Sequence, residues 1–309
     1  MKKKFSSNGR NVIVSSDQFT PNQLQYIEIA ARSYLETTLA LFFTNLYVEL
    51  DKESDNPGEL MRAGKKFLLR KRIVYIQPRA FNDEVNDFVT LFIHESIHLV
   101  HDEITEFTKH YDERVERLKS AVELQKYVDE PEITANYIAR ILRVGLLGFQ
   151  AMVQSEGLAQ FGMLYLGKDQ EGDKRYWMKN SKETFEEFYG QALKAAQEIQ
   201  QQWQIIMMNK ADVQAVWSQL SNINPDSFAK KIRGNYHPYI IGPHMVQAIL
   251  FLEPDLTFYD VIKMNPAKFF VTYETAMNKA GKTPVVSYSG NSGVFSYGGA
   301  IAELTAWIR

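Results

Sequence analysis

The stretch that decides the fold is FIHESIHLV at residues 92–100. His94 and His98 lie four residues apart, so on an α-helix both imidazole rings project from one face and can reach the same metal ion. Glu95 follows the first histidine and is placed to act as a general base toward a water that the metal activates. Burying these three polar side chains among apolar neighbours would be costly without a metal. The pattern His-Glu-x-x-His therefore predicts a zinc site on one helix.

A catalytic zinc ion needs a third protein ligand and an open position for water. The chain contains no cysteine, so this ligand must be a histidine or a carboxylate. Glu156 is the best candidate, because its neighbours on a helix are apolar and a carboxylate on such a face is rarely left unpaired. Gly157 beside it would permit the close approach of another helix. The alternative for Glu156 is a structural salt bridge to an arginine such as Arg140.

A helix with His-Glu-x-x-His, followed by a helix with Glu-Gly-x-Ala at residues 156–159, resembles the gluzincin group of zinc metallopeptidases. The resemblance covers these two helices, which are separated by a longer gap than in the thermolysin-like and aminopeptidase members. It implies a zincin-like fold, with zinc bound by His94, His98 and Glu156 and with Glu95 as the general base.

The longer metzincin pattern requires a glycine at position 101 and a histidine at position 104, where this chain has His101 and Ile104. That class of zinc peptidase is therefore excluded. On a helix, His101 lies about 4.5 Å beyond His98 along the axis. We expect it to support the ligands from the next turn or to face solvent.

The resemblance also implies a tyrosine or histidine on a separate helix, which would stabilise the oxyanion of the tetrahedral intermediate. The segment YHPYIIGPHM at residues 236–245 carries four such donors just before a predicted helix at 243–252. His237 and Tyr239 are the first choices, and His244 and Tyr236 are the alternatives. Aromatic residues that cap a core helix would explain the segment equally well.

The expected fold is α+β and predominantly helical. A small N-terminal α/β lobe at residues 1–110 carries the motif helix, and a helical lobe at 111–309 carries the third ligand and the oxyanion donors, together forming one catalytic unit. The N-terminal lobe is expected to contain strands at 11–15, 46–50 and 67–77, a loop at 51–64, and helices at 21–44 and 82–108. Further helices are expected at 131–166, 181–209, 211–220, 243–252, 257–263 and 266–280, then a tail rich in Gly, Ser and Tyr at 287–299 and a short final helix.

The strand at residues 72–77 directly precedes the motif helix. In zincin-like architecture, a sheet edge above that helix pairs with an extended peptide through main-chain hydrogen bonds. Pro78 ends the strand and the basic residues 70–72 favour an exposed edge. The strand is therefore a candidate for the substrate-binding edge, with an ordinary structural strand as the alternative.

Composition narrows the classes of partner. The net charge is −2 and the pI is near 6.3, which argue against nucleic acid or another polyanion as the main partner. The basic start at residues 2–4 is not followed by an apolar stretch, and no segment is apolar enough over a sufficient length to cross a bilayer. We therefore expect no membrane association and a cytoplasmic location, although delivery as a host-directed effector stays an alternative.

These observations predict a zinc-dependent metallopeptidase that acts on a peptide or protein substrate. One alternative is a zinc-dependent hydrolase of small amides or esters, which would be favoured by a closed pocket without a groove. Another is a non-catalytic helical interaction protein with a vestigial metal site. Glu95 argues against the last alternative, because a purely structural zinc site needs no base beside its ligand.

Overall fold

The computed structural model describes residues 1–309 except 52–59, 67–70, 106–134, 167–180, 213–214, 217–236, 290–292 and 308–309. It confirms a predominantly helical chain with a small N-terminal mixed sheet. The chain forms two compact units, the first from Met1–Ile104 with Leu158–Ser181 and the second from Thr105–Gly157 with Lys182–Arg309. No described helix combines the length and the apolar character needed to cross a membrane.

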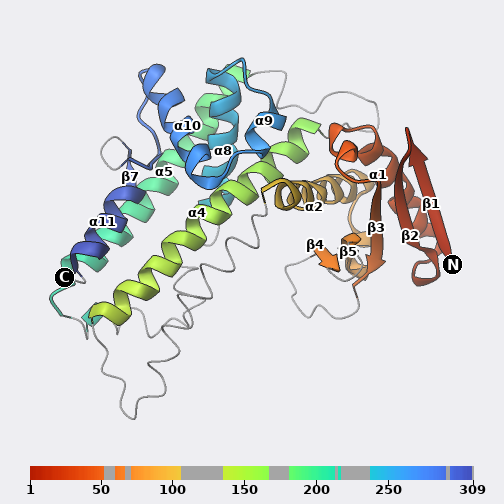
Figure 1. The fold of residues 1–309 in the computed structure, drawn as a ribbon, viewed down its shortest axis with the longest axis horizontal. Coiled ribbons are helices and arrows are strands. Elements are labelled where there is room, and N and C mark those ends of the chain that lie inside the picture. Colours follow the sequence, from red (N-terminus) through yellow and green to blue (C-terminus); the bar gives the residue numbers. More distant parts are fainter. Residues whose placement is uncertain are drawn as a thin grey trace, which may run out of the picture. The chain divides into compact units, whose positions relative to one another are not determined.

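The first unit is built around a five-stranded mixed sheet in the order β1-β2-β3-β5-β4 (Figure 1). The strands are β1 (Lys2–Ser7), β2 (Arg10–Ser15), β3 (Asn45–Leu50), β4 (Met61–Lys66) and β5 (Lys71–Ile76). β2, β3 and β5 run parallel, whereas the outer strands β1 and β4 are antiparallel to their neighbours. The predicted strands at 11–15 and 46–50 are confirmed as β2 and β3.

Strand β1 was not predicted, although its turn carries a local signal. Asn8 and Gly9 both have positive φ, at 47° and 75°, and they join β1 to β2. An Asn-Gly pair with positive φ at both residues is typical of the tight turn of a β-hairpin. The lysines of the basic N-terminal stretch therefore lie on an outer strand, where charged side chains discourage pairing with other chains.

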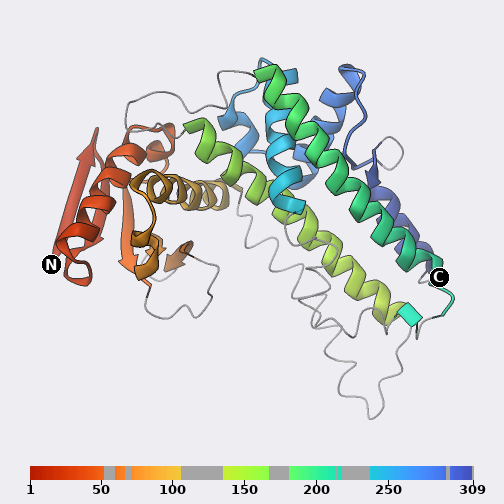
Figure 2. The same ribbon diagram turned by 180° about the vertical axis from the view of Figure 1, so that it is seen from behind.

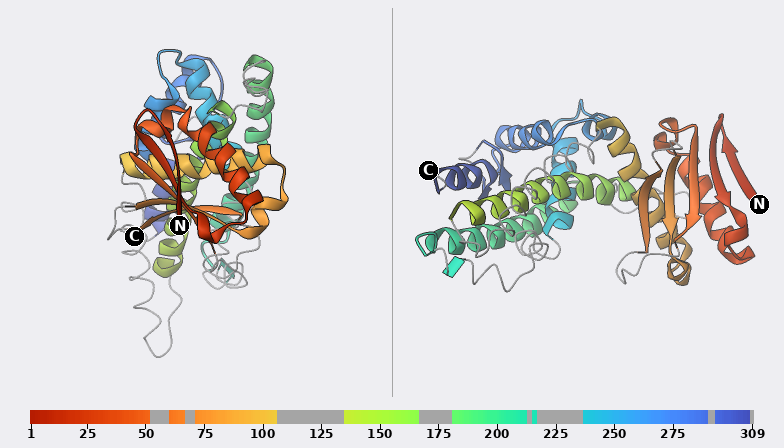
Figure 3. Two further views of the ribbon diagram at one scale, coloured as in Figure 1. Left: turned by 90° about the vertical axis from the view of Figure 1, so that its right-hand side faces the viewer. Right: turned by 60° about the horizontal axis from the view of Figure 1, so that its bottom comes forward.

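Two helices, α1 (Pro21–Leu35) and α2 (Val85–Thr105), belong to the first unit (Figure 3). Thr20 starts α1 through a capping box with Gln23. The helices contact each other through Tyr34 and Phe92, whose ring centroids are 6.2 Å apart. Buried side chains from alternate positions form the apolar face of the sheet: Phe5, Val12, Val14, Leu46, Val48, Met61, Val74 and Ile76.

The prediction that residues 72–77 form the edge of the sheet is wrong, because β5 lies between β3 and β4. Ile73 and Val74 point to opposite faces and are both buried, as is typical of an interior strand. The basic start of β5 is accommodated locally: Lys71 lies over the ring of Tyr47, and Arg72 pairs with Glu103. The outer strand at this end of the sheet is β4, whose first residues overlap the stretch 51–64 that was predicted to be a loop.

The second unit is helical (Figure 2). Its helices are α5 (Ser181–Met208), α8 (His237–Leu252), α9 (Phe258–Ile262), α10 (Pro266–Lys279) and α11 (Tyr297–Trp307), and it also contains the short parallel strands β6 (Val286–Ser287) and β7 (Phe295–Ser296). Most of α4 (Ala135–Leu166) belongs to this unit as well, whereas the residues of α4 from Leu158 onward belong to the first unit. The predicted helices at 181–209, 257–263 and 266–280 are confirmed. Most of the predicted helix at 211–220 lies outside the described residues.

Helix α8 begins six residues earlier than predicted and contains Pro243 in its interior. A proline there removes one backbone hydrogen bond and normally ends a helix. In this helix, every residue from Ile241 to Ile249 is buried. The burial of this surface over about two and a half turns therefore outweighs the local cost of the proline.

Helices α4 and α8 touch at two glycines. A Cβ added to Gly157 would lie 2.5 Å from the carbonyl carbon of Gly242, and a Cβ on Gly242 would lie 2.3 Å from the carbonyl oxygen of Val153. Only glycine at both positions allows the two backbones to approach so closely. The close helix approach predicted at Gly157 is confirmed.

Candidate metal centre

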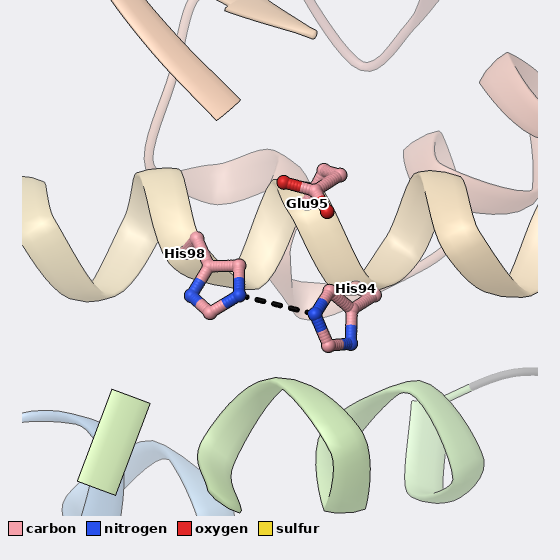
Figure 4. A group of neighbouring side chains, drawn as sticks. All are labelled: His94, Glu95 and His98. Carbon is pink, nitrogen blue, oxygen red and sulfur yellow. Dashed lines mark hydrogen bonds between the residues drawn. The ribbon is translucent and has the colours of Figure 1, made fainter. Parts of the chain in front are cut away.

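The two motif histidines lie in the middle of α2 and face the same way. Figure 4 shows both imidazole rings projecting from one side of the helix, with the two Nε2 atoms 3.1 Å apart. Two nitrogen ligands of a tetrahedral zinc ion, each about 2.05 Å from the metal, are separated by roughly 3.3 Å. The two rings form a hydrogen bond in this structure, and the separation of their nitrogens fits two ligands of one metal ion; His94 is buried.

The third member of the motif, Glu95, lies close to the histidines but points in another direction (Figure 4). One potential ligand atom from each of His94, Glu95 and His98 falls within 4.8 Å of the others. The Oε2 atom of Glu95 accepts a hydrogen bond of 2.7 Å from the backbone N–H of Ala63 on β4. This orientation suits a base that acts on a water beside the metal better than it suits a third ligand.

Two further polar residues of α2, Ser96 and His101, are buried beside the motif. Ser96 is fully buried and donates its hydroxyl proton to the backbone carbonyl of Phe92 at 2.7 Å. His101 is 1% exposed, so the alternative that it faces solvent is wrong. Burial, followed by the nearby charge of His98, lowers the pKa of His101 to about 3. His101 is therefore neutral at physiological pH.

Glu156, the predicted third ligand, lies on α4 and is half-buried. It belongs to the second unit, whereas the two histidines belong to the first. The Gly157–Gly242 contact fixes the α4 backbone immediately beside it. Its role as a zinc ligand stays a prediction that rests on the sequence.

The two predicted oxyanion donors lie in the first turn of α8. The Nε2 atom of His237 is 2.8 Å from a carboxylate oxygen of Glu198 on α5, so this histidine has a hydrogen-bond partner within its own unit. Tyr239 is 37% exposed. Tyr236, one of the alternatives, lies outside the described residues. The role of these donors stays a prediction.

His244, the other alternative, is an internal structural group of the second unit. It is fully buried, and its Nε2 atom lies 3.2 Å from the hydroxyl of Tyr273. The same hydroxyl accepts a hydrogen bond from the backbone N–H of Val285, so its own proton is directed at His244. Burial lowers the pKa of His244 to about 3 and keeps the ring neutral.

Ala63 is the residue of this centre that the sequence did not indicate. It takes part through its backbone N–H, and the stretch MRAGKK at residues 61–66 has none of the β-branched residues that favour strands. The Asn56-Pro57-Gly58 turn signal nearby favoured a loop for the whole region. Only the pairing of β4 with β5 places this N–H above α2.

Comparison with known proteins identified no relative: no family model, no curated protein and no solved structure matches the chain.

Proposed function

We propose that the protein is a zinc-dependent metallopeptidase with its catalytic centre on α2. The observation that carries this proposal is the convergence of the two histidine Nε2 atoms to 3.1 Å with the Glu95 carboxylate alongside. The pairing distance matches an edge of a tetrahedral zinc site.

His94 and His98 would hold the metal, and Glu156 is the third ligand that we assign from the resemblance to gluzincins. The donor set of two imidazoles and one carboxylate is one that catalytic zinc sites use, with a further position for water. A bound zinc ion would lower the pKa of that water to about 7 and polarise the carbonyl of the scissile bond.

Glu95 would carry the proton during hydrolysis. Its carboxylate would take one proton from the attacking water and pass it to the nitrogen of the leaving group, so that cleavage of the amide bond yields a carboxylic acid and an amine. The acid then gives up its remaining proton to the amine, which leaves a carboxylate and an ammonium group. Because Glu95 lies within 4.8 Å of the histidine nitrogens yet is hydrogen-bonded to Ala63 on β4, it would lie near the reacting water without taking a ligand position.

The sheet supports a peptide as the substrate. β4 is the outer strand, runs antiparallel to β5 and contacts the motif helix through the bond from Ala63 to Glu95. A strand at the edge of a sheet, beside a catalytic helix, is suited to bind an extended peptide by strand addition. In a zincin-like arrangement, β4 takes the role that the sequence had suggested for residues 72–77.

Metal analysis of the purified protein tests the proposal directly. We expect one zinc ion per chain in the wild type, loss of zinc in His94→Ala and His98→Ala, and weaker binding in Glu156→Ala. A wild type without stoichiometric zinc would refute the whole proposal, whereas full affinity in Glu156→Ala would refute only the third ligand.

Cleavage of a mixed peptide library tests the catalytic role. Glu95→Gln should keep zinc and lose turnover, because an amide cannot accept the proton. Glu103→Gln on the same helix is the matched control and should keep turnover, since Glu103 pairs with Arg72. Equal activity of Glu95→Gln and the wild type would exclude the general-base role, and cleavage of small amides but no peptides would favour a small-molecule hydrolase.

A further inference from the structure

The hydrogen bond between β4 and Glu95 uses a backbone group that edge strands normally leave to solvent. In an antiparallel pair, residues alternate between those that bond to the neighbouring strand and those that face away from it. The carbonyl of Leu60 accepts a hydrogen bond from the N–H of Gln77 at 3.0 Å, which sets this alternation. By the same register, Met61 and Ala63 direct their N–H groups away from β5.

Because the N–H of Ala63 points away from β5, it can bond to another group without breaking a hydrogen bond of the sheet. It meets the carboxylate of Glu95 at 2.7 Å, with the Oε2 atom as the acceptor. A glutamate side chain has three rotatable bonds, so a carboxylate bonded through one oxygen loses much of its freedom. The other oxygen, Oε1, is the one that we assign to the proton transfer.

We infer that the backbone N–H of Ala63 is a positioning group for Glu95, which orients the carboxylate for proton transfer. This inference rests on the proposed function, because it concerns the geometry of the proposed base. It assigns β4 a second role besides offering an edge to the substrate: the strand also sets the direction of the catalytic carboxylate. The contact is made by the backbone N–H of Ala63 and not by its side chain.

Amide hydrogen exchange tests the contact without any assay of activity. In the full-length protein we expect the amide of Ala63 to exchange at least tenfold more slowly than an outward amide of an outer strand that has no acceptor. Glu95→Ala should remove this protection, whereas Glu103→Ala should leave it unchanged. An Ala63 amide that exchanges equally fast in the wild type and in Glu95→Ala would overturn the inference.

Replacing the Ala63 amide by an ester tests the catalytic consequence, because an ester removes the N–H and keeps the side chain. The matched control is an ester at Lys4 on the other outer strand, whose N–H by the same alternation points away from β2. Each ester also weakens one carbonyl that pairs with the neighbouring strand, that of Arg62 with β5 or that of Lys3 with β2, so both variants carry a similar effect on the sheet.

The loss of a hydrogen bond to a charged group changes a rate or equilibrium constant by a factor of about 10 to 100. We therefore expect the Ala63 ester to lower kcat by about that factor, with KM and zinc content unchanged. The Lys4 ester should stay within twofold of the wild type. Equal kcat for both esters would overturn the inference. A wild type that binds zinc but cleaves nothing would refute the proposed function, and with it the catalytic role of Ala63, while the exchange experiment would still report on the contact.

Discussion

The contact between Gly157 and Gly242 allows a prediction whose sign can be worked out from distances. A Cβ at position 242 would lie 2.3 Å from the carbonyl oxygen of Val153 and 2.6 Å from the Cα of Gly157, whereas ordinary contacts begin near 3.4 Å. Both obstacles are backbone atoms, which cannot move aside as a flexible side chain can. Gly242→Ala therefore requires α4 and α8 to separate by about 1 Å.

The expected cost follows from two opposing effects. Overpacking of this kind costs about 3 kcal/mol at its upper range. Replacing a helical glycine by alanine returns about 1 kcal/mol through helix propensity. The net loss of about 2 kcal/mol corresponds to a melting temperature lower by roughly 4–8 °C for a unit of this size.

Gly190 provides the matched control, because it lies on α5 with no heavy atom within 4 Å of an added Cβ. Gly190→Ala receives only the gain in helix propensity, so we expect a melting temperature higher by about 2–4 °C. Thermal unfolding followed by circular dichroism measures both variants. The reasoning would be refuted if Gly242→Ala were as stable as the wild type or shifted in the same direction as Gly190→Ala.

Three further predictions concern stability. Thr20→Ala removes the capping box of α1 and should lower the free energy of unfolding by about 1 kcal/mol in urea denaturation, whereas Thr20→Ser should retain it. The pKa of His244 is lowered in the fold, to about 3 from an ordinary value near 6.5, so its contribution to stability is complete well above pH 6.5 and is lost as the pH falls. Between about pH 5.5 and 4, the wild type should lose about 1.4 kcal/mol per pH unit more than His244→Gln. Glu274 is buried and accepts hydrogen bonds from the backbone N–H groups of Tyr288 and Ser289. Glu274→Ala should therefore lower the free energy of unfolding by about 2–3 kcal/mol, as measured by calorimetry, and a decrease below about 0.5 kcal/mol would contradict this structural role.

Local signals in the sequence were sufficient for several elements. The helix at residues 85–105, the strands at 10–15 and 45–50 and the helix from Ser181 follow from hydrophobic periodicity and capping residues. The side-by-side arrangement of His94 and His98 follows from the pitch of an α-helix alone. These features depend on residues that are neighbours along the chain, which is why a single sequence determines them.

Other features depended on pairing and packing between distant segments. The position of β5 inside the sheet, the outer position of β4 and the bond from Ala63 to Glu95 are set by the register between strands. Helix α8 continues past Pro243 because the residues on both sides of this proline are buried.

The sequence by itself therefore determined the chemistry of the candidate centre: two imidazoles and a carboxylate in the spacing that zinc hydrolases use. Only the tertiary structure decided which backbone group orients that carboxylate. The physical reason is that an N–H group is present at every residue except proline, so its role is invisible in the sequence. Its direction is fixed only when a strand 32 residues away pairs in one register.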